Sequence, residues 1–228
     1  MTVSPLSPEE IRILLLPYLS GEVALMEDLS KRPELLEHIS VYVGLLLRWN
    51  ERINLTSIRN AREIVRRHFG ESLYAARHLH ERGTLLDLGS GAGFPGLAIQ
   101  LWSSGLEVTL AESQSKKASF LREVIRSLQL PTAVWGGRAE EFPRGGIFDV
   151  VVMRGVDAMD SALRSAARLT RSDVWVIGSP ASVAGLPSEL VLKERISMPE
   201  SEASYLFHLV LANVPRGTAR SVSDENRL

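Results

Sequence analysis

Residues 84–112 read Thr-Leu-Leu-Asp-Leu-Gly-Ser-Gly-Ala-Gly-Phe-Pro-Gly-Leu-Ala-Ile-Gln-Leu-Trp-Ser-Ser-Gly-Leu-Glu-Val-Thr-Leu-Ala-Glu, and this stretch decides the fold. The apolar run 84–88 ends at a glycine cluster, which predicts a short buried strand. The clustered glycines let the backbone take positive φ and come close to a ligand. Pro95 stands where a helix would begin, and proline is tolerated there because its missing N–H is not needed. We therefore expect a helix over 96–102 and a second strand over 107–111, ended by Glu112.

The loop between these elements has the form of a nucleotide-binding turn. Residues 91–96 match G-x-G-x-x-G, and Glu112 stands about 20 residues on, where a ribose-binding acid is expected. Asp87, however, would repel a pyrophosphate and suits a ligand with a cationic amino-acid end, such as S-adenosylmethionine (SAM). A turn whose glycines serve packing alone and a dinucleotide site are the alternatives. If SAM binds, we expect it to contact Asp87, Gly89, Ser90, Gly91, Ala92, Gly93, Phe94 and Glu112.

Size and composition limit the remaining possibilities. The chain has 228 residues, of which 45% are hydrophobic, which suits one large α/β domain or one domain with an extension. It has no cysteine, so disulfides and thiolate metal sites are excluded, and we expect no metal. No leader sequence and no apolar run of about 20 residues is present, so we expect a cytoplasmic protein that does not enter a membrane.

Charge is unevenly distributed along a chain whose formal net charge is only −1. A small net charge argues mildly against a general nucleic-acid binder. Acids are in excess over residues 1–47, whereas arginines are in excess over residues 48–82. Arginine suits bidentate phosphate contacts. The arginines Arg59, Arg62, Arg66 and Arg67 are therefore interpreted either as a solvated helix face or as a phosphate-binding edge.

Apolar periodicity predicts three helices before the glycine loop and a strand–helix alternation after it. The first helix starts after the Ser7-Pro8 cap, and the others cover 30–48 and 60–76. The later elements are a helix over 115–128 capped by Ser115, strands over 132–135 and 148–153, a helix over 161–169, a strand over 174–177, and two strand-like runs over 191–198 and 205–214. This alternation predicts a parallel sheet with right-handed crossovers.

The order of elements predicts a Rossmann-like, SAM-dependent methyltransferase fold of the α/β class. We expect a mostly parallel central sheet with an antiparallel C-terminal strand, because the last two runs are close enough to pair. An N-terminal helical extension over 1–80 precedes the methyltransferase core over 81–215, and a polar tail follows over 216–228.

Residues 86–97, Leu-Asp-Leu-Gly-Ser-Gly-Ala-Gly-Phe-Pro-Gly-Leu, together with Phe142-Pro143 and Met153-Arg154, resemble the glucose-inhibited division protein B family. The resemblance covers most of residues 30–215 and is strongest over 44–72 and 84–154. It implies a SAM-dependent methyltransferase acting on guanine N7 in 16S ribosomal RNA. The partner it implies is 16S rRNA or the small ribosomal subunit, and we expect a monomer.

The resemblance also implies site residues. Asn54 matches an Asn-Leu-Thr motif near the cofactor and target base, and His68 matches an Arg-His-x-x-Asp/Glu-Ser motif beside the active site. Ala139 and Glu140 fall at the adenine position, Arg138 near the methionine end or the RNA, and Arg154 at an arginine after the fourth strand. Each residue also has a structural interpretation. Asn54 is then a turn residue capping the next helix, His68 a core histidine, residues 136–142 a polar loop, and Arg154 half of an ion pair.

The chain departs from the family pattern at two places. The family usually has Lys-Gly after the fifth strand, where Gly178-Ser179-Pro180 stands here, and often Arg-His near the last strand, where Phe207-His208 stands here. Two basic groups that would hold rRNA are therefore absent. The alternatives to the rRNA enzyme are a SAM-binding ribosome-associated or regulatory protein without catalysis, and a methyltransferase for another RNA or a small molecule.

Overall fold

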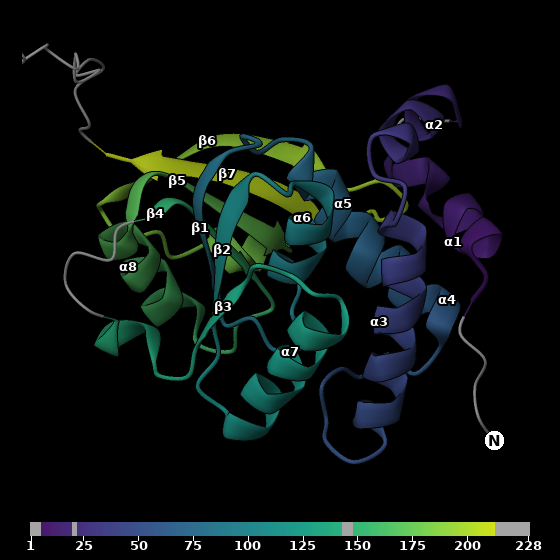
Figure 1. The fold of residues 1–228 in the computed structure, drawn as a ribbon. Coiled ribbons are helices and arrows are strands. Elements are labelled where there is room, and N and C mark those ends of the chain that lie inside the picture. The colour runs from purple at the N-terminus through teal and green to yellow at the C-terminus, as the bar shows by residue number, and fades with distance from the viewer. Residues whose placement is uncertain (1–5, 20–21, 143–147, 213–228) are drawn as a thin grey trace, which may run out of the picture.

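The computed structural model describes residues 6–19, 22–142 and 148–212. A sheet of seven strands forms its centre, in the order β3-β2-β1-β4-β5-β7-β6 (Figure 1). The strands are β1 (Gly83–Leu88), β2 (Leu106–Ala111), β3 (Ala133–Trp135), β4 (Phe148–Arg154), β5 (Thr170–Gly178), β6 (Leu190–Ser197) and β7 (Tyr205–Leu211).

The antiparallel strand β7 distinguishes this sheet from that of a dinucleotide-binding domain. Strands β1 to β5 pair in parallel, whereas β7 runs antiparallel to both β5 and β6. Dinucleotide-binding Rossmann sheets have the strand order 3-2-1-4-5-6, with no strand inserted before the last. The predicted Rossmann-like methyltransferase fold, including its antiparallel C-terminal strand and last strand pair, is confirmed.

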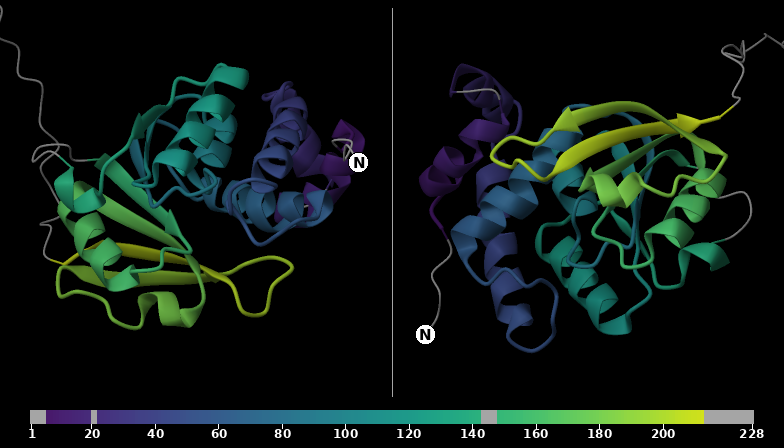
Figure 2. Two further views of the ribbon diagram at one scale, coloured as in Figure 1. Left: turned by 90° about the horizontal axis from the view of Figure 1, so that it is seen from below. Right: turned by 180° about the vertical axis from the view of Figure 1, so that it is seen from behind.

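Each face of the sheet has its own apolar core, because side chains alternate between the faces of a strand. One face, with Leu85 and Val152, packs under α6 (Gly96–Trp102) and α7 (Ser115–Ser127). The other face, with Leu86 and Val151, packs under α8 (Met159–Leu169). Figure 2 shows α8 on the opposite side of the sheet from α6 and α7. Short 3-10 turns cover Leu16–Tyr18, Ala139–Glu141 and Pro180–Val183.

A helical layer precedes the first strand. It consists of α1 (Pro8–Leu15), α2 (Glu22–Ser30), α3 (Leu35–Asn50), α4 (Ala61–Glu63), the π-helical segment η2 (Ile64–Gly70) and α5 (Glu71–Ala76). The same apolar cluster runs from these helices through α6 and α7 to the sheet. The helical layer therefore continues the core of one sheet face. The domain boundary at residue 80 stays a prediction, and the predicted tail over 216–228 lies outside the described residues.

Several predicted helix boundaries are wrong. The helix expected over 30–48 begins only at Leu35, as α3, and a separate helix that was not predicted, α2, ends at Ser30. Pro33 lies between them, and proline disfavours helical backbone in the residue before it. The helix expected over 60–76 begins at Ala61 and widens into the π-helical segment. Gln114, not Ser115, precedes the first residue of α7.

The predicted boundaries near the glycine loop agree with the structure to within one residue. Helix α6 has the predicted bounds, and β1 and β2 each begin one residue earlier than predicted. The Ser7 cap is also correct, because Glu10 N donates to the Ser7 hydroxyl while Ser7 N donates to the Glu10 carboxylate.

Candidate functional site

The glycine loop joins β1 to α6 at the carboxyl end of β1, where open α/β sheets bind their ligands. Gly89, Gly91 and Gly93 have φ angles of 75°, 55° and 88°, which other residues rarely adopt. A Cβ atom on Gly93 would lie 2.2 Å from the Tyr42 hydroxyl oxygen. That hydroxyl donates to the Ala92 carbonyl at 2.6 Å. The loop is therefore held closely against α3 of the helical layer.

Asp87 lies beneath this loop with one carboxyl oxygen unpaired. The side chain is fully buried, and Oδ2 accepts from Gly96 N at 3.0 Å. Oδ1 has no hydrogen-bond partner within the described residues. Burial raises the pKa of the Asp87 carboxyl to about 7. The bond from Gly96 and the Ser90 side chain oppose the shift, and the Glu112 charge adds to it. A buried unpaired carboxyl oxygen suits a cationic donor such as an ammonium group.

The same residue argues against a dinucleotide. Pyrophosphates bind the free amides at a helix N-terminus. Here the Asp87 carboxyl already occupies the first amide of α6, and the loop amides of Gly89 and Ser90 both donate to the Ala111 carbonyl. The site offers a negative group where a pyrophosphate needs a positive one.

Glu112 follows β2 and faces the loop from the neighbouring strand. Its Oε2 accepts from Gly91 N at 2.9 Å, and its Oε1 accepts from Gln114 N at 2.7 Å. The side chain is buried. Two amides thus fix the carboxylate, while each oxygen keeps a further lone pair for a hydroxyl donor.

A cavity of about 200 Å³ opens beside Glu112. Its walls come from the carboxyl ends of β1, β2 and β4, from the loop after β3 and from the start of α8. Of the sequence-predicted residues it includes Gly89, Glu112, Arg138, Ala139 and Glu140. Sequence reasoning missed its other lining residues, which are Leu88, Ala111, Ser113, Gly137, Val156, Ala158, Ser161 and Ala162.

The loop after β3 is fixed by hydrogen bonds from α8. Arg168 donates to the Ala139 carbonyl at 2.7 Å, and the Ser161 hydroxyl donates to the Glu140 carboxylate at 2.7 Å. That bond lowers the pKa of Glu140. The Arg138 side chain is exposed at the rim. Pro143, which the family resemblance also used, lies outside the described residues.

A second cluster, separate from the cavity, joins His68 and Arg154. Arg154 ends β4, donating to His68 Nδ1 at 2.8 Å and to Glu71 Oε2 at 2.9 Å. The side chain of Glu71 is 2% exposed and that of Arg154 is 15% exposed. The His68 ring stacks on Phe94 of the glycine loop at 4.8 Å between centroids. The cluster therefore contacts the glycine loop from the helical layer.

His68 is uncharged in this cluster. Burial lowers its pKa to about 3, and the charges of Arg154 and Arg67 add to the shift. Its Nε2 lies 2.8 Å from the Thr56 hydroxyl oxygen. The structural interpretations of both residues describe their contacts, since His68 is a buried histidine with partners and Arg154 forms an ion pair with Glu71. Whether either also touches a ligand stays a prediction.

Asn54 does not reach this cluster. It is exposed, and among the described residues its side chain has one hydrogen bond, which it accepts from Arg59 at 3.5 Å. The suggestion that Asn54 caps the next helix is wrong, because Asn60 does so by accepting from the backbone N–H of Arg62 and Glu63. Asn50, which sequence reasoning missed, is buried and organises the loop by accepting from Leu55 N and Thr56 N.

A larger cavity of about 430 Å³ lies among the arginines of η2. It is lined by Tyr18, Asn60, Arg62, Glu63, Arg66, Arg67 and Glu200. Arg62 pairs with Glu10 at 3.2 Å and Arg67 with Glu71 at 3.3 Å. Arg66 forms no ion pair with any described residue. Through Glu71 this cavity is connected to the His68–Arg154 cluster.

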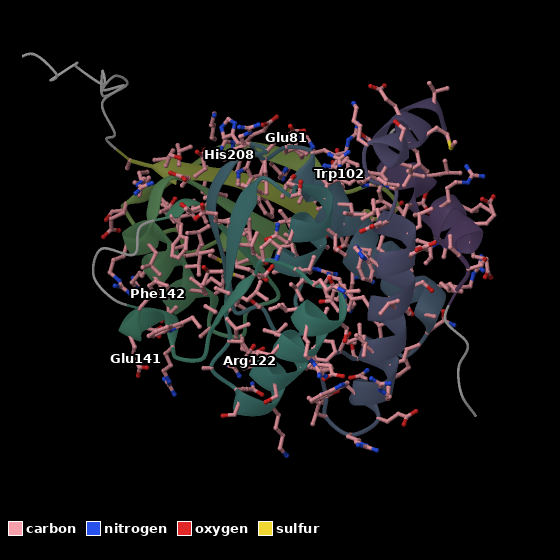
Figure 3. The ribbon with its side chains drawn as sticks, viewed as in Figure 1. Glu81, Trp102, Arg122, Glu141, Phe142 and His208 are labelled. Atoms are coloured by element: carbon pink, nitrogen blue, oxygen red, sulfur yellow. The ribbon has the colours of Figure 1, made fainter. Side chains whose placement is uncertain are left out.

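The two departures from the family pattern lie at different places. Gly178-Ser179-Pro180 is at the carboxyl end of β5, where Ile177 pairs with Arg154, so this departure lies at the ligand edge. Phe207 is 1% exposed and belongs to the core under α8. His208 contacts Asp173 at 2.5 Å, near the beginning of β5. Figure 3 shows His208 at the opposite end of the sheet from Phe142, which follows the loop after β3. Position 208 is on β7, which β4 and β5 separate from β1, and position 207 is enclosed in the core.

Residues 6–19, 22–142 and 148–212 contain neither a candidate metal site nor a candidate membrane-spanning helix. No group of three or more His, Asp or Glu side chains is placed to hold a metal ion. In the same part of the chain, no helix is long and apolar enough to cross a membrane.

Residues 35–177 match the GidB family model, described as rRNA small subunit methyltransferase G. A ribosomal RNA small subunit methyltransferase G of Stenotrophomonas maltophilia (strain K279a) is 41% identical over 145 residues, covering 63% of this chain and 66% of the relative. That is just under two thirds of the relative. The same-named protein of Xylella fastidiosa (strain M23) is 36% identical over 167 residues, covering 70% and 78%.

A solved structure supports the fold alone. A putative RNA methyltransferase from Pyrococcus horikoshii superposes with a TM-score of 0.52 at 17% identity, covering 75% of this chain and 96% of that one. The agreement at such low identity concerns the arrangement of the sheet and its helices.

Proposed function

Because the chain belongs to the rRNA small subunit methyltransferase G family, we propose that it transfers the methyl group of SAM to guanine N7 in the 16S rRNA of the small subunit. The observation that carries the proposal is the buried, unpaired Oδ1 of Asp87 beneath the glycine loop. A neutral ligand without a donor at this point would leave this buried carboxyl oxygen without a hydrogen-bond partner, whereas an ammonium group would supply one.

The chain's own residues fit SAM along its length. Asp87 would accept from the ammonium group of the methionine end, and Glu112 from the ribose hydroxyls. The cavity beside Glu112 would take the adenine ring, with Ala139 and Glu140 on the wall held by α8. Arg138, exposed at the rim, would contact the methionine end or an RNA phosphate.

The reaction needs positioning more than proton transfer. SAM supplies a sulfonium methyl group that is already activated, and guanine N7 has an in-plane lone pair and no proton to lose. Holding the two reactants in line then lowers the activation barrier by several kcal/mol. The upper range for well-oriented reactants is roughly 7–11 kcal/mol. A neutral His68 suits this chemistry, because its role is to hold neighbouring groups in place and no proton has to be removed.

The arginine-lined cavity at η2 would hold the RNA backbone. Arg66 lacks an ion pair among the described residues and is therefore available to a phosphate, whereas Arg62 and Arg67 are already paired. The acids Glu63 and Glu200 also line the cavity, so the site favours one phosphate more than a long anionic stretch. This supports the phosphate-binding interpretation of the arginine face.

Two measurements test the proposal. Calorimetry should detect SAM binding by the wild-type protein and none by Asp87→Ala, with NADH binding neither. Turnover should then appear with small ribosomal subunits and be absent from a cell extract depleted of ribosomes. Activity confined to the depleted extract would assign a different acceptor, and SAM binding without any turnover would assign a regulatory role.

A further inference from the structure

The hydrogen bonds that join Glu71, Arg154 and His68 can run in only one direction. A guanidinium group has donors and no acceptor, so Arg154 donates both to Glu71 Oε2 at 2.9 Å and to His68 Nδ1 at 2.8 Å. His68 is neutral, because burial and the charges of Arg154 and Arg67 lower its pKa to about 3. With Nδ1 acting as an acceptor, the single ring proton is on Nε2.

This direction fixes what the Thr56 hydroxyl can do. Its oxygen accepts from His68 Nε2 at 2.8 Å and from Ile58 N at 3.2 Å. A hydroxyl oxygen has two lone pairs, so both are used. What remains is the hydroxyl hydrogen, for which no described residue provides an acceptor. The bonds through Arg154 and His68 thus leave Thr56 with one free donor and no free acceptor.

Thr56 is connected to the ligand edge of the sheet through His68. Its partner His68 stacks on Phe94, the residue that follows the last glycine of the loop. Its second neighbour along the chain of bonds, Arg154, ends β4 beside β1. Thr56 is therefore joined to the glycine loop through His68, on the side of the loop that contacts the helical layer.

We propose that the Thr56 hydroxyl donates its hydrogen to O6 of the target guanine and so selects guanine over adenine, an inference that rests on the proposed function. Guanine presents two acceptors, N7 and O6, on one edge, whereas adenine presents N7 beside an amino donor. N7 uses its lone pair to attack the methyl group, which leaves O6 for Thr56. The Thr56 hydroxyl has no free lone pair, so it cannot accept a hydrogen bond from the amino group of adenine, and adenine is disfavoured. Thr56 is then a specificity-determining residue, and His68, Arg154 and Glu71 are positioning residues.

The test compares Thr56→Val, which keeps the shape and removes the hydroxyl, with Thr56→Ser, which keeps the hydroxyl. The substrates are small subunits reconstituted with 16S rRNA that carries guanine or 2-aminopurine at the methylated position. 2-Aminopurine keeps N7 and lacks O6. Loss of one such bond in a desolvated site should lower the rate by about tenfold to a hundredfold. The wild-type protein and Thr56→Ser should prefer guanine by that factor, and Thr56→Val should show little preference.

The ratio of the two rates also tests the positioning residues. Glu71→Gln keeps the size of the side chain but holds Arg154 less firmly, and it should reduce the guanine preference although Thr56 is intact. A purely structural effect would lower both rates and leave the ratio unchanged.

Two results would overturn the proposal. One is a Thr56→Val protein that retains the wild-type preference for guanine. The other is a Thr56→Val protein whose only defect is a raised KM for SAM, because the hydroxyl would then serve the methionine carboxylate. A wild-type protein that methylates no guanine would instead overturn the proposed function, so the two failures are distinguishable.

Discussion

Replacing Asp87 by asparagine should stabilise the protein and abolish SAM binding at the same time. The Asp87 side chain is fully buried, with Gly96 N donating to one oxygen and no described partner for the other. Burial raises the pKa of the carboxyl from 3.8 to about 7. Asparagine keeps an oxygen for the Gly96 amide and removes the charge, so the variant no longer has to bury an ionised group.

The sign and size of the effect follow from linkage. Between pH 3.8 and about 7 the folded state holds a proton on Asp87 that the unfolded state has released. Stability therefore falls as pH rises through this window and is constant above it. A shift of about three pKa units sets an upper limit of about 4 kcal/mol. The amide nitrogen of asparagine would lack a partner, which costs about 1–3 kcal/mol of stability. We therefore expect a net gain of about 2 kcal/mol at pH 8.

Thermal unfolding of both proteins from pH 4 to pH 8 measures this gain. A gain of about 2 kcal/mol should raise the midpoint by roughly 4–8 °C at pH 8. Toward pH 4 the linkage gain is lost and the cost of the unpaired amide remains, so the difference should reverse and leave Asp87→Asn less stable by about 1–3 kcal/mol. Calorimetry should detect no SAM binding by Asp87→Asn. For the wild-type protein below pH 7, SAM binding should release protons, because a cationic ligand favours the ionised carboxyl. A stability difference independent of pH, or wild-type SAM affinity in Asp87→Asn, would refute the reasoning.

The remaining predictions concern the loop, the ribose acid and the arginine cavity. Gly93→Ala should lower the free energy of unfolding by about 2 kcal/mol or more, measured by denaturant titration, because its Cβ meets a tyrosine oxygen at positive φ. Glu112→Gln should weaken SAM binding about tenfold in calorimetry, since an amide cannot accept from both backbone donors, whereas Glu107→Gln, exposed on the same strand, should bind normally. Arg66→Ala should weaken RNA binding and reduce the slope of log K against log salt by about 1, whereas the exposed Arg164→Ala on α8 should change neither. An equal effect in either control would contradict the corresponding assignment.

Local signals explain what the sequence predicted well. The run from Thr84 to Glu112 has its strand, turn and helix defined by neighbouring glycines, a proline and apolar residues, so the bounds of α6 needed no long-range information. The acids Asp87 and Glu112 could be assigned to the loop because both end adjacent parallel strands. The last strand pair was predictable from the short connection between two apolar runs.

Contacts between distant residues explain what the sequence did not predict. Glu71 and Thr56 belong to the two motifs that contain His68 and Asn54, but the sequence assigned them no role. Their contacts depend on Arg154 and His68, which are 86 residues apart and in contact. Asn50 lies in a predicted packing helix, and only the folded loop gives it buried backbone partners. Helix α2 was missed because its apolar pattern is weak; among its side chains that the structure describes, Leu25 alone is fully buried.

The most direct test of the central claim uses SAM labelled in its methyl group. The protein is incubated with purified small ribosomal subunits that lack the modification, with naked 16S rRNA, and with RNA from which 16S rRNA has been removed. The account predicts label in 16S rRNA, at one guanine whose backbone becomes cleavable after reduction and aniline treatment, the reaction expected of N7-methylguanine. Label in any other base, or in RNA without 16S rRNA, would contradict it, as would no label from a protein that binds SAM.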